Sequence, residues 1–224
     1  MPAFEHAVKL GYTYVETDVH VTADGVLVAF HDESLHRVTD RTGLIRELPW
    51  SEVRTARVDG VEPIVVMEDL LTTWPDLRIN IDPKDDTSVE PLIDLIRRTD
   101  SVHRVCVGSF SDRRIERVRA ALGAALCTSL GPKGTARLKA AGYGARFTLP
   151  SPCAQLPVKT RGLVVTDERL VRTAHRLGLQ VHVWTIDDPA EMVRLLDMGV
   201  DGIMTDRPGV LKEVLEARGE WVAS

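Results

Sequence analysis

The stretch LQVHVWTIDDPAEMVRLLDMGVDGIMTDRP, residues 179–208, decides the fold class. Up to Thr185 its β-branched residues alternate with other residues, which predicts a strand. A helical pattern follows, with Pro189 in its first turn and Gly199 after its last turn. The run VDGIMTD is then predicted to be a second strand. Two strands joined by a helix of about a dozen residues form the repeating unit of a parallel α/β sheet.

The same plan recurs along the chain. Helices are predicted in SDRRIERVRAALG and TDERLVRTAHRLG, each between a polar N-cap and a terminal glycine. Strands are predicted in TYVETDVHVT, VLVAFHD, LRINIDPK, RVCVGSF, AALCTSL and GLVVT. We therefore predict about seven parallel strands, one fewer than a (β/α)8 TIM-type barrel has. No GxGxxG follows a strand, so a barrel is favoured over an open doubly wound sheet, with residues 1–224 forming one domain.

The composition is that of a soluble protein. A net charge of −5 gives no reason to expect nucleic acid or an acidic membrane surface as a partner, so a small anionic substrate would need a metal or a few basic groups. The three cysteines are odd in number and lack CxxC spacing, which predicts reduced core residues and a cytoplasmic location. No transmembrane segment or signal peptide is recognisable.

The stretch VETDVHVTADGVLVAFHD, residues 15–32, combines a tight turn with polar side chains. The Asp-Gly pair predicts a β-hairpin, in which His31 lies near Glu16 and Asp18 on the facing arm. Side chains two apart in a strand share a face, so the two carboxylates could bind one hard divalent cation while the imidazole transfers a proton. His20 is expected to face solvent. Alternating polar residues can equally mark the solvent face of a hairpin.

A third acid follows another apolar run. RINIDPK ends in Asp82 and, two residues on, Lys84. Because the carboxyl ends of barrel strands share one mouth, Asp82 could complete a three-carboxylate metal site, and Lys84 could offset phosphate charge. The alternative is an ordinary Asp-Pro at the start of a loop. Trp184, at another strand end, could be a core residue or an aromatic wall at the mouth.

The residues GYTYVETDVHVTADGVLVAFHDESLHRVTDRTG, 11–43, resemble the glycerophosphodiester phosphodiesterase pattern ExDVxxTxDGxxVxxHDxxLxRxT. The resemblance continues through INIDPK, SFS and VWTIDDPAEMVRLLDMGVDGIMTDRP, and so covers nearly the whole chain. It implies a TIM-type barrel of the phospholipase-C-like phosphodiesterases. It also implies hydrolysis of glycerophosphodiesters to glycerol 3-phosphate and an alcohol, with calcium or magnesium as cofactor.

The resemblance also assigns residues. The metal-ligand positions of the family fall on Glu16, Asp18 and Asp82. The last position is usually Glu, so the shorter Asp is expected to alter the geometry or the metal preference. His31 falls on one of the two catalytic histidines, and Lys84 and Trp184 fall on substrate-pocket positions.

One departure concerns the start of the chain. Family members open with a strand ending in His-Arg-Gly and a Pro-Glu-Asn-Thr turn, and MPAFEHAVKLG corresponds to the helix after that turn. The expectation is a chain that lacks the first strand and the second catalytic histidine. Two hypotheses follow: a phosphodiesterase whose start has been placed too late, or a weakly active or inactive barrel, a pseudoenzyme that binds phosphodiesters or a partner. A phospholipase C or D relative is a further alternative. Exposed barrel edges would favour self-association.

Overall fold

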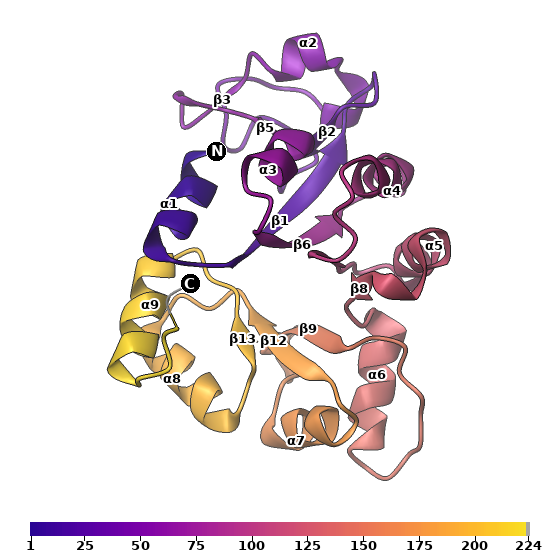
Figure 1. Ribbon diagram of the computed structural model, residues 1–224, viewed down its shortest axis with the longest axis vertical. Helices are drawn as coiled ribbons and strands as arrows, with labels where there is room; N and C mark the ends of the chain where they lie inside the picture. Colours follow the sequence, from indigo (N-terminus) through magenta and orange to yellow (C-terminus); the bar gives the residue numbers. More distant parts are fainter. Residues whose placement is uncertain (223–224) are drawn as a thin grey trace. The chain divides into compact units, whose positions relative to one another are not determined.

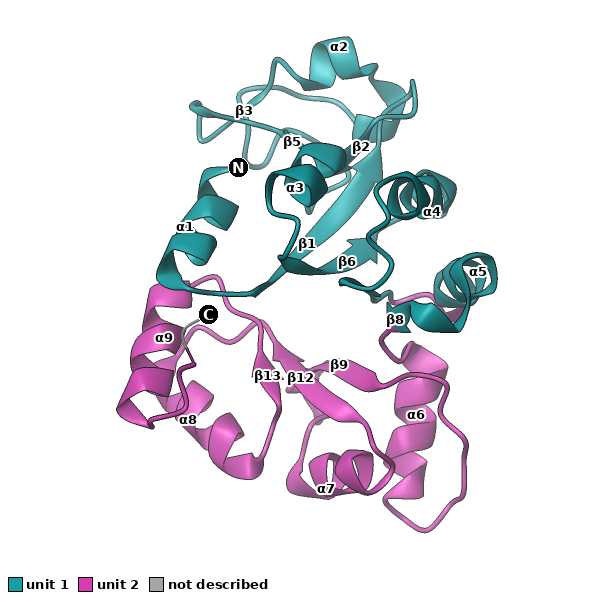
Figure 2. Ribbon diagram, in the orientation of Figure 1, with its two compact units in different colours: residues 1–109, 113–127 teal, residues 110–112, 128–224 magenta. Residues whose placement is uncertain are grey.

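A computed structural model describes residues 1–222. The chain divides into two compact units, coloured separately in Figure 2. Unit 1 comprises residues 1–109 and 113–127, and unit 2 comprises residues 110–112 and the chain from residue 128 onward. The arrangement of elements within each unit can be followed in Figure 1.

Unit 1 is built around a six-stranded sheet in the order β5-β2-β1-β6-β7-β8. Its strands are β1 (Tyr14–Val21), β2 (Leu27–Ala29), β5 (Val65–Val66), β6 (Arg78–Pro83), β7 (Val105–Val107) and β8 (Cys127–Thr128). A small separate ribbon joins β3 (Arg57–Val58) to β4 (Glu62–Pro63). The helices are α1 (Pro2–Leu10), α2 (Trp50–Val53), α3 (Met67–Thr73), α4 (Val89–Arg98) and α5 (Asp112–Leu122), which begins at the unit boundary. Short 3-10 turns occupy Ile45–Glu47 and Gly123–Ala125.

The centre of this sheet is parallel, as predicted. Strand β6 runs parallel to both β1 and β7, and helices connect these strands. In the β1–β6 register Asp18 lies beside Asp82 and Glu16 lies beside Asn80. The register places two of the predicted acids on neighbouring strands at the same level, which positions the site described below.

The predicted hairpin is confirmed as β1 and β2, which pair antiparallel with Val19 opposite Ala29 and Val21 opposite Leu27. The turn is held by Thr22, whose hydroxyl donates to Asp24 Oδ1 at 2.6 Å, and Gly25 adopts a φ of 90° that favours glycine. Strand β2 ends at Ala29, so His31 lies outside the regular ladder.

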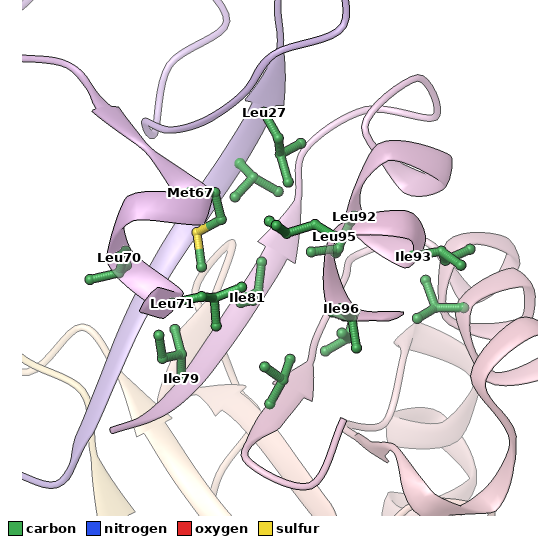
Figure 3. Packing of buried hydrophobic residues seen from close by; sticks show 14 of the residues in the cluster. Leu27, Met67, Leu70, Leu71, Ile79, Ile81, Leu92, Ile93, Leu95 and Ile96 are labelled. Atoms are coloured by element: carbon green, nitrogen blue, oxygen red, sulfur yellow. The ribbon is translucent and has the colours of Figure 1, made fainter. Parts of the chain in front are cut away.

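The core of unit 1 lies between the sheet and helices α3 and α4 (Figure 3). Helix α4 buries an apolar stripe at helical spacing. The stripe consists of Val89, Leu92, Ile93, Leu95 and Ile96. It belongs to the same cluster as Ile79 and Ile81 of β6, so the core fixes the strand that carries Asp82.

We expect Leu92→Ala to lower the free energy of unfolding by about 2–5 kcal/mol, because Leu92 is fully buried and its truncation leaves a cavity. Urea unfolding measures this change. The control is Val61→Ala, since Val61 is 70% exposed, and its effect should stay within about 0.5 kcal/mol. Equal effects of the two substitutions would contradict the described packing.

Unit 2 contains a three-stranded sheet in the order β13-β12-β9, with both neighbouring pairs parallel. The strands are β9 (Cys153–Pro157), β12 (Gln180–Trp184) and β13 (Gly202–Ile203). The helices are α6 (Pro132–Ala141), α7 (Glu168–Arg176), α8 (Pro189–Met198) and α9 (Pro208–Ala217). The strand–helix–strand unit predicted from residues 179–208 is confirmed. Helix α8 begins after Asp188, whose carboxylate accepts from Glu191 N at 2.8 Å, and ends at Gly199 with a φ of 93°.

One strand prediction was wrong. GLVVT does not form a parallel strand: Leu163–Val164 is β11, which pairs antiparallel with β10 (Lys159–Thr160) in a small hairpin. Arg161 and Gly162 both have positive φ values, 47° and 80°, as a two-residue hairpin turn requires. The parallel strand of this region is β9, CAQLP, which the sequence reading missed because prolines flank and end it.

None of the helices that the structure describes has the length and apolar character that crossing a bilayer requires.

Candidate active site

The structure brings together three of the predicted site residues where β1 and β6 lie side by side. Lys84 Nζ is 2.6 Å from Asp18 Oδ1 and 3.3 Å from Asp82 Oδ2. The backbone of Lys84 is fixed as well, since its N–H donates to the carbonyl of Val19 at 3.1 Å. An ammonium group therefore lies between two carboxylates near the carboxyl end of β6, where the sequence placed the site.

Asp82 is the most constrained of these groups. Burial raises the pKa of its carboxyl group, and the Asp18 carboxylate adds to the rise, while Lys84 works in the opposite direction. Its Oδ1 is buried and has no hydrogen-bond partner among the described residues. A buried carboxylate oxygen without a partner is unfavourable and requires an explanation. A cation bound at this atom would supply one, so the donor set fits a divalent metal.

Lys84 remains a cation in this setting. Burial disfavours the charged form of Lys84, but the hydrogen bond and charge of Asp18, together with Asp82, outweigh burial and raise its pKa. The lysine can therefore offset negative charge on a bound phosphate at neutral pH.

Glu16 lies on the same strand, two residues before Asp18, and its side chain is exposed. Strand geometry places the two side chains on one face. Within the described residues, however, the oxygen atoms of Glu16, Asp18 and Asp82 do not all lie within 4.8 Å of one another. The three acids share a region of the sheet, and Lys84 occupies the space between two of them.

His31 is held from one side by its neighbour. Its Nδ1 is 2.7 Å from Asp32 Oδ1, and Arg37 Nη2 donates to the same oxygen at 2.9 Å. The Arg37 guanidinium and the His31 ring hold the pKa of the Asp32 carboxyl well below its usual range. The His31 side chain is 69% exposed, and its engaged Nδ1 makes Nε2 the nitrogen that can exchange a proton.

A cavity of about 200 Å³ joins His31 to the carboxylate–lysine group. It is lined by His20, His31, Glu33, Arg46, Lys84 and Asp85. Arg46 was not singled out in the sequence, because an arginine in a short 3-10 turn carries no sequence signal. It pairs with Glu33 at 3.3 Å and adds a second cation to the cavity wall.

The expectation that His20 faces solvent is wrong. Its relative exposure is 5%, its Nδ1 is 3.1 Å from Asp85 Oδ2, and its Nε2 is 3.2 Å from the carbonyl oxygen of His31. His20 is two residues after Asp18, so strand alternation already predicts that the two side chains share a face.

Asp85 caps helix α4 at the edge of the cavity. Its Oδ1 accepts from Ser88 N and Ser88 Oγ, both at 2.8 Å, and from Thr87 Oγ1 at 2.6 Å. Burial opposes ionisation of this carboxyl group, but the hydrogen bonds from His20, Thr87 and Ser88 outweigh burial and lower its pKa below the usual range. Asp85 thus connects the end of α4 to His20.

The lowered pKa of Asp85 predicts how the stability of the protein depends on pH. Stabilisation by ionised Asp85 is fully present above the carboxyl pKa of the unfolded chain, about 4, and is lost as pH falls through the lower folded-state value. We expect the stability of the wild-type protein to fall between about pH 4 and pH 2, and Asp85→Asn to flatten this part of the profile. Chemical unfolding at a series of pH values measures it. Asp59→Asn, in an exposed turn, should leave the profile unchanged.

Trp184 belongs to unit 2 and ends strand β12. Its ring meets that of Phe110 edge-to-face, with centroids 5.6 Å apart and an interplanar angle of 82°. Nearby strand ends are tied by Asp187, whose Oδ1 accepts from Thr205 Oγ1 at 2.8 Å and from Asp206 N at 2.9 Å. Trp184 is half-buried at the carboxyl edge of the sheet of unit 2. Its aromatic neighbour Phe110 is 67% exposed.

Known proteins of one family match this sequence along nearly the whole chain. Residues 1–210 match the sequence model of the glycerophosphoryl diester phosphodiesterase family. The probable glycerophosphodiester phosphodiesterase 2 of Mycobacterium tuberculosis is 43% identical over 227 residues, covering 99% of this chain and 86% of that protein. The lysophospholipase D GDPD1 of Homo sapiens is 27% identical, with 96% of this chain and 81% of that protein covered.

Solved structures agree on the fold. A glycerophosphodiester phosphodiesterase from Parabacteroides distasonis superposes with a TM-score of 0.77 at 24% identity, covering 96% of this chain and 89% of that one. An Oleispira antarctica phosphodiesterase, in complex with the product sn-glycerol-3-phosphate, gives a TM-score of 0.77 at 19% identity, covering 96% and 90%. The predicted α/β fold of TIM-barrel type is confirmed, and the chain belongs to the glycerophosphoryl diester phosphodiesterase family.

Proposed function

We propose that the chain hydrolyses glycerophosphodiesters to glycerol 3-phosphate and an alcohol at the cavity lined by His31 and Lys84. The observation that carries the proposal is this cavity, which joins a proton-exchanging imidazole to a lysine held by two carboxylates. Family membership supports the same reaction class, and the M. tuberculosis relative is named for that reaction.

The reaction needs charge neutralisation and proton transfer. Water adds to phosphorus, the bond from phosphorus to the alcohol oxygen breaks, and the alcohol leaves with a proton. Lys84 and Arg46, both on the cavity wall, can neutralise the phosphate oxygens. His31, with Nδ1 held by Asp32, can take up or deliver a proton at Nε2. Asp32 keeps the ring in one orientation.

We also propose that a divalent cation, calcium or magnesium, is held by Glu16, Asp18 and Asp82. All three offer the oxygen ligands that both ions prefer, and the partnerless Oδ1 of Asp82 supports the assignment. When bound, such an ion polarises phosphoryl oxygens. The three residues would hold the ion, and Lys84, between Asp18 and Asp82, would neutralise phosphate oxygens.

The remaining assignments extend the same proposal. We propose that residues 1–224 act as one domain and that Trp184 contacts the substrate. The proposed binding partner is a small glycerophosphodiester and not nucleic acid, and the proposed location is the cytoplasm.

We also propose that the protein self-associates. Strand β2 pairs with β1 only over Val19–Val21, and Phe30 N bonds to Asp18 O, so within the described residues Tyr14–Thr17 has a pairing strand on one side only. Light scattering after gel filtration tests self-association, and a monomer over the micromolar range would contradict it.

Product identity tests the proposed reaction. With glycerophosphocholine the chain should release choline and glycerol 3-phosphate, whereas a phospholipase-C-type reaction releases phosphocholine and glycerol. Assays of free choline and of phosphocholine separate the two. Lysophosphatidylcholine, tested alongside, shows whether an acylated glycerol is accepted. Phosphocholine as the product would overturn the proposal.

A further inference from the structure

Two features of the structure go beyond the proposed function. The first is the pair formed by buried His20 and half-buried Asp85, and the second is a basic and apolar surface on unit 2.

We propose that His20 is a positioning residue that fixes the backbone of His31, a role that rests on the proposed function. Strand β2 ends at Ala29, and the last ladder-like bond is from Phe30 N to Asp18 O at 2.9 Å. The next tie to β1 is the contact between His20 Nε2 and His31 O at 3.2 Å. A carbonyl only accepts, so His20 donates this hydrogen bond from Nε2.

His20 is itself held in place. Its ring is buried, and its Nδ1 is 3.1 Å from Asp85 Oδ2, while the other oxygen of Asp85 caps α4. Asp85 directly follows Lys84 in the chain. The His20–Asp85 pair thus holds the backbone on both sides of the cavity, at His31 and next to Lys84. A misplacement of about 1 Å at a reacting group can lower a rate about 100-fold, so this pair matters for turnover.

Two substitutions of His20 separate its contact with His31 from its contact with Asp85. The amide of His20→Gln extends to the place of Nε2 and can still donate to His31, whereas the shorter amide of His20→Asn reaches only the place of Nδ1 and Asp85. We expect His20→Asn to lower kcat about 10- to 100-fold with little change in KM. His20→Gln should recover most of kcat. In a His31→Ala background, His20→Asn should add little.

Hydrogen exchange gives a readout that does not depend on activity. His20→Asn should speed amide exchange of residues 30–32 relative to His20→Gln, whether or not the wild-type protein turns over substrate. Faster exchange without any wild-type activity would refute the proposed function alone. Equal kcat values and equal exchange rates in the two variants would overturn the positioning role.

The second inference concerns charge distribution. Although the chain has a net charge of −5, residues 133–176 contain nine Lys and Arg against two Asp and Glu. Two exposed segments lie in this part of unit 2. They are residues 143–148, after α6, and residues 159–164, which form the β10–β11 hairpin. We call these two segments the basic face.

The basic face also exposes apolar side chains. Tyr143 and Leu163 are each 70% exposed, Val164 is 48% exposed and Phe147 is 39% exposed. Lys159 and Arg161 stand beside them in the hairpin. Exposed apolar side chains interspersed with cations are typical of segments that enter the headgroup region of a membrane.

Each segment contacts a neighbouring helix. Lys139 Nζ of α6 donates to the carbonyl oxygen of Val164 at 2.6 Å. The guanidinium of Arg169, in α7, lies 4.5 Å from the centroid of the Tyr143 ring. Tyr143, Lys159, Val164 and Arg169 line one groove, together with the acids Asp167, Glu168 and Glu191. The hairpin begins directly after β9, at the edge of the sheet of unit 2 where Trp184 ends β12.

We infer that the basic face docks on a lipid bilayer with anionic headgroups. Charge complementarity favours an anionic partner, and the exposed leucine, valine and aromatic side chains favour a bilayer over a soluble acidic protein. This inference does not depend on the proposed reaction.

Vesicle sedimentation tests the inference. The wild-type protein should pellet with vesicles of equal parts phosphatidylcholine and phosphatidylglycerol, and not with phosphatidylcholine alone. The charge variant, Lys159→Gln with Arg161→Gln, should bind at least about tenfold more weakly. The apolar variant, Leu163→Ser with Val164→Ser, should bind more weakly at raised salt. The control, Arg41→Gln with Arg54→Gln, makes the same charge change on exposed residues of unit 1 and should bind as the wild type does.

Circular dichroism shows that each variant is folded. Failure of the wild-type protein to bind anionic vesicles would overturn the inference. Undiminished binding of the apolar variant at raised salt would show that Leu163 and Val164 do not enter the bilayer and would contradict the apolar part of the inference.

Discussion

Replacing His31 by alanine is expected to lower kcat for glycerophosphocholine by about 10²–10⁴-fold, the usual contribution of one general acid or base. The ring stands on the cavity wall beside Lys84, and its bond to Asp32 prepares Nε2 for proton transfer. KM should change little, because the positive charge that binds phosphate comes from Lys84 and Arg46. Steady-state release of choline measures both constants.

The matched control is His36→Ala. His36 lies on the same loop, is exposed, and bonds to Ser34 Oγ at 3.0 Å without lining the cavity. Its loss should leave kcat unchanged. If His31→Ala turned over substrate as fast as the wild-type protein, another group would perform the proton transfer and the assignment of His31 would be wrong.

The second large effect concerns the divalent cation. Calcium or magnesium should raise the Tm, because an ion that binds only the folded state stabilises it by mass action. At about a hundredfold excess over Kd the gain is about 2.7 kcal/mol. For a chain of this size that corresponds to a Tm rise of roughly 5–10 °C. Asp18→Asn and Asp82→Asn should remove most of the rise. Differential scanning fluorimetry with and without the ion measures it.

Two further variants serve as controls for this prediction. Asp18 also pairs with Lys84, so its replacement changes more than metal binding. Glu16→Gln leaves that pair intact and should still reduce the rise. Glu52→Gln, an exposed acid outside the site, should not. A rise of the same size in all four variants would place the ion elsewhere.

The central features of the fold were predictable because they rest on local patterns. The Asp24-Gly25 pair determined the hairpin, and the apolar run ending in Asp82 indicated a buried parallel strand. The proximity of Asp82 to Asp18 was expected because the carboxyl ends of barrel strands share one mouth, and the pairing of β1 with β6 provides it. The exact register is set by the turn, where Thr22 N bonds to Val26 O at 3.0 Å.

Other features depend on contacts that the sequence does not reveal. The burial of His20 follows from Asp85, which lies 65 residues away. Arg46 lines the cavity from a three-residue 3-10 turn, which has no distinctive sequence pattern. Strand β9 contains only five residues and ends in proline, so neither its length nor its composition distinguished it from a loop.

The most direct measurement is phosphorus NMR of glycerophosphocholine incubated with the purified chain and millimolar calcium or magnesium. The diester signal should decline while the monoester signal of glycerol 3-phosphate grows in equal amount, and His31→Ala should slow this conversion by at least about 100-fold. A folded protein that leaves the diester signal unchanged with either ion, or a His31→Ala protein that converts it at the wild-type rate, would contradict a phosphodiesterase site at this cavity.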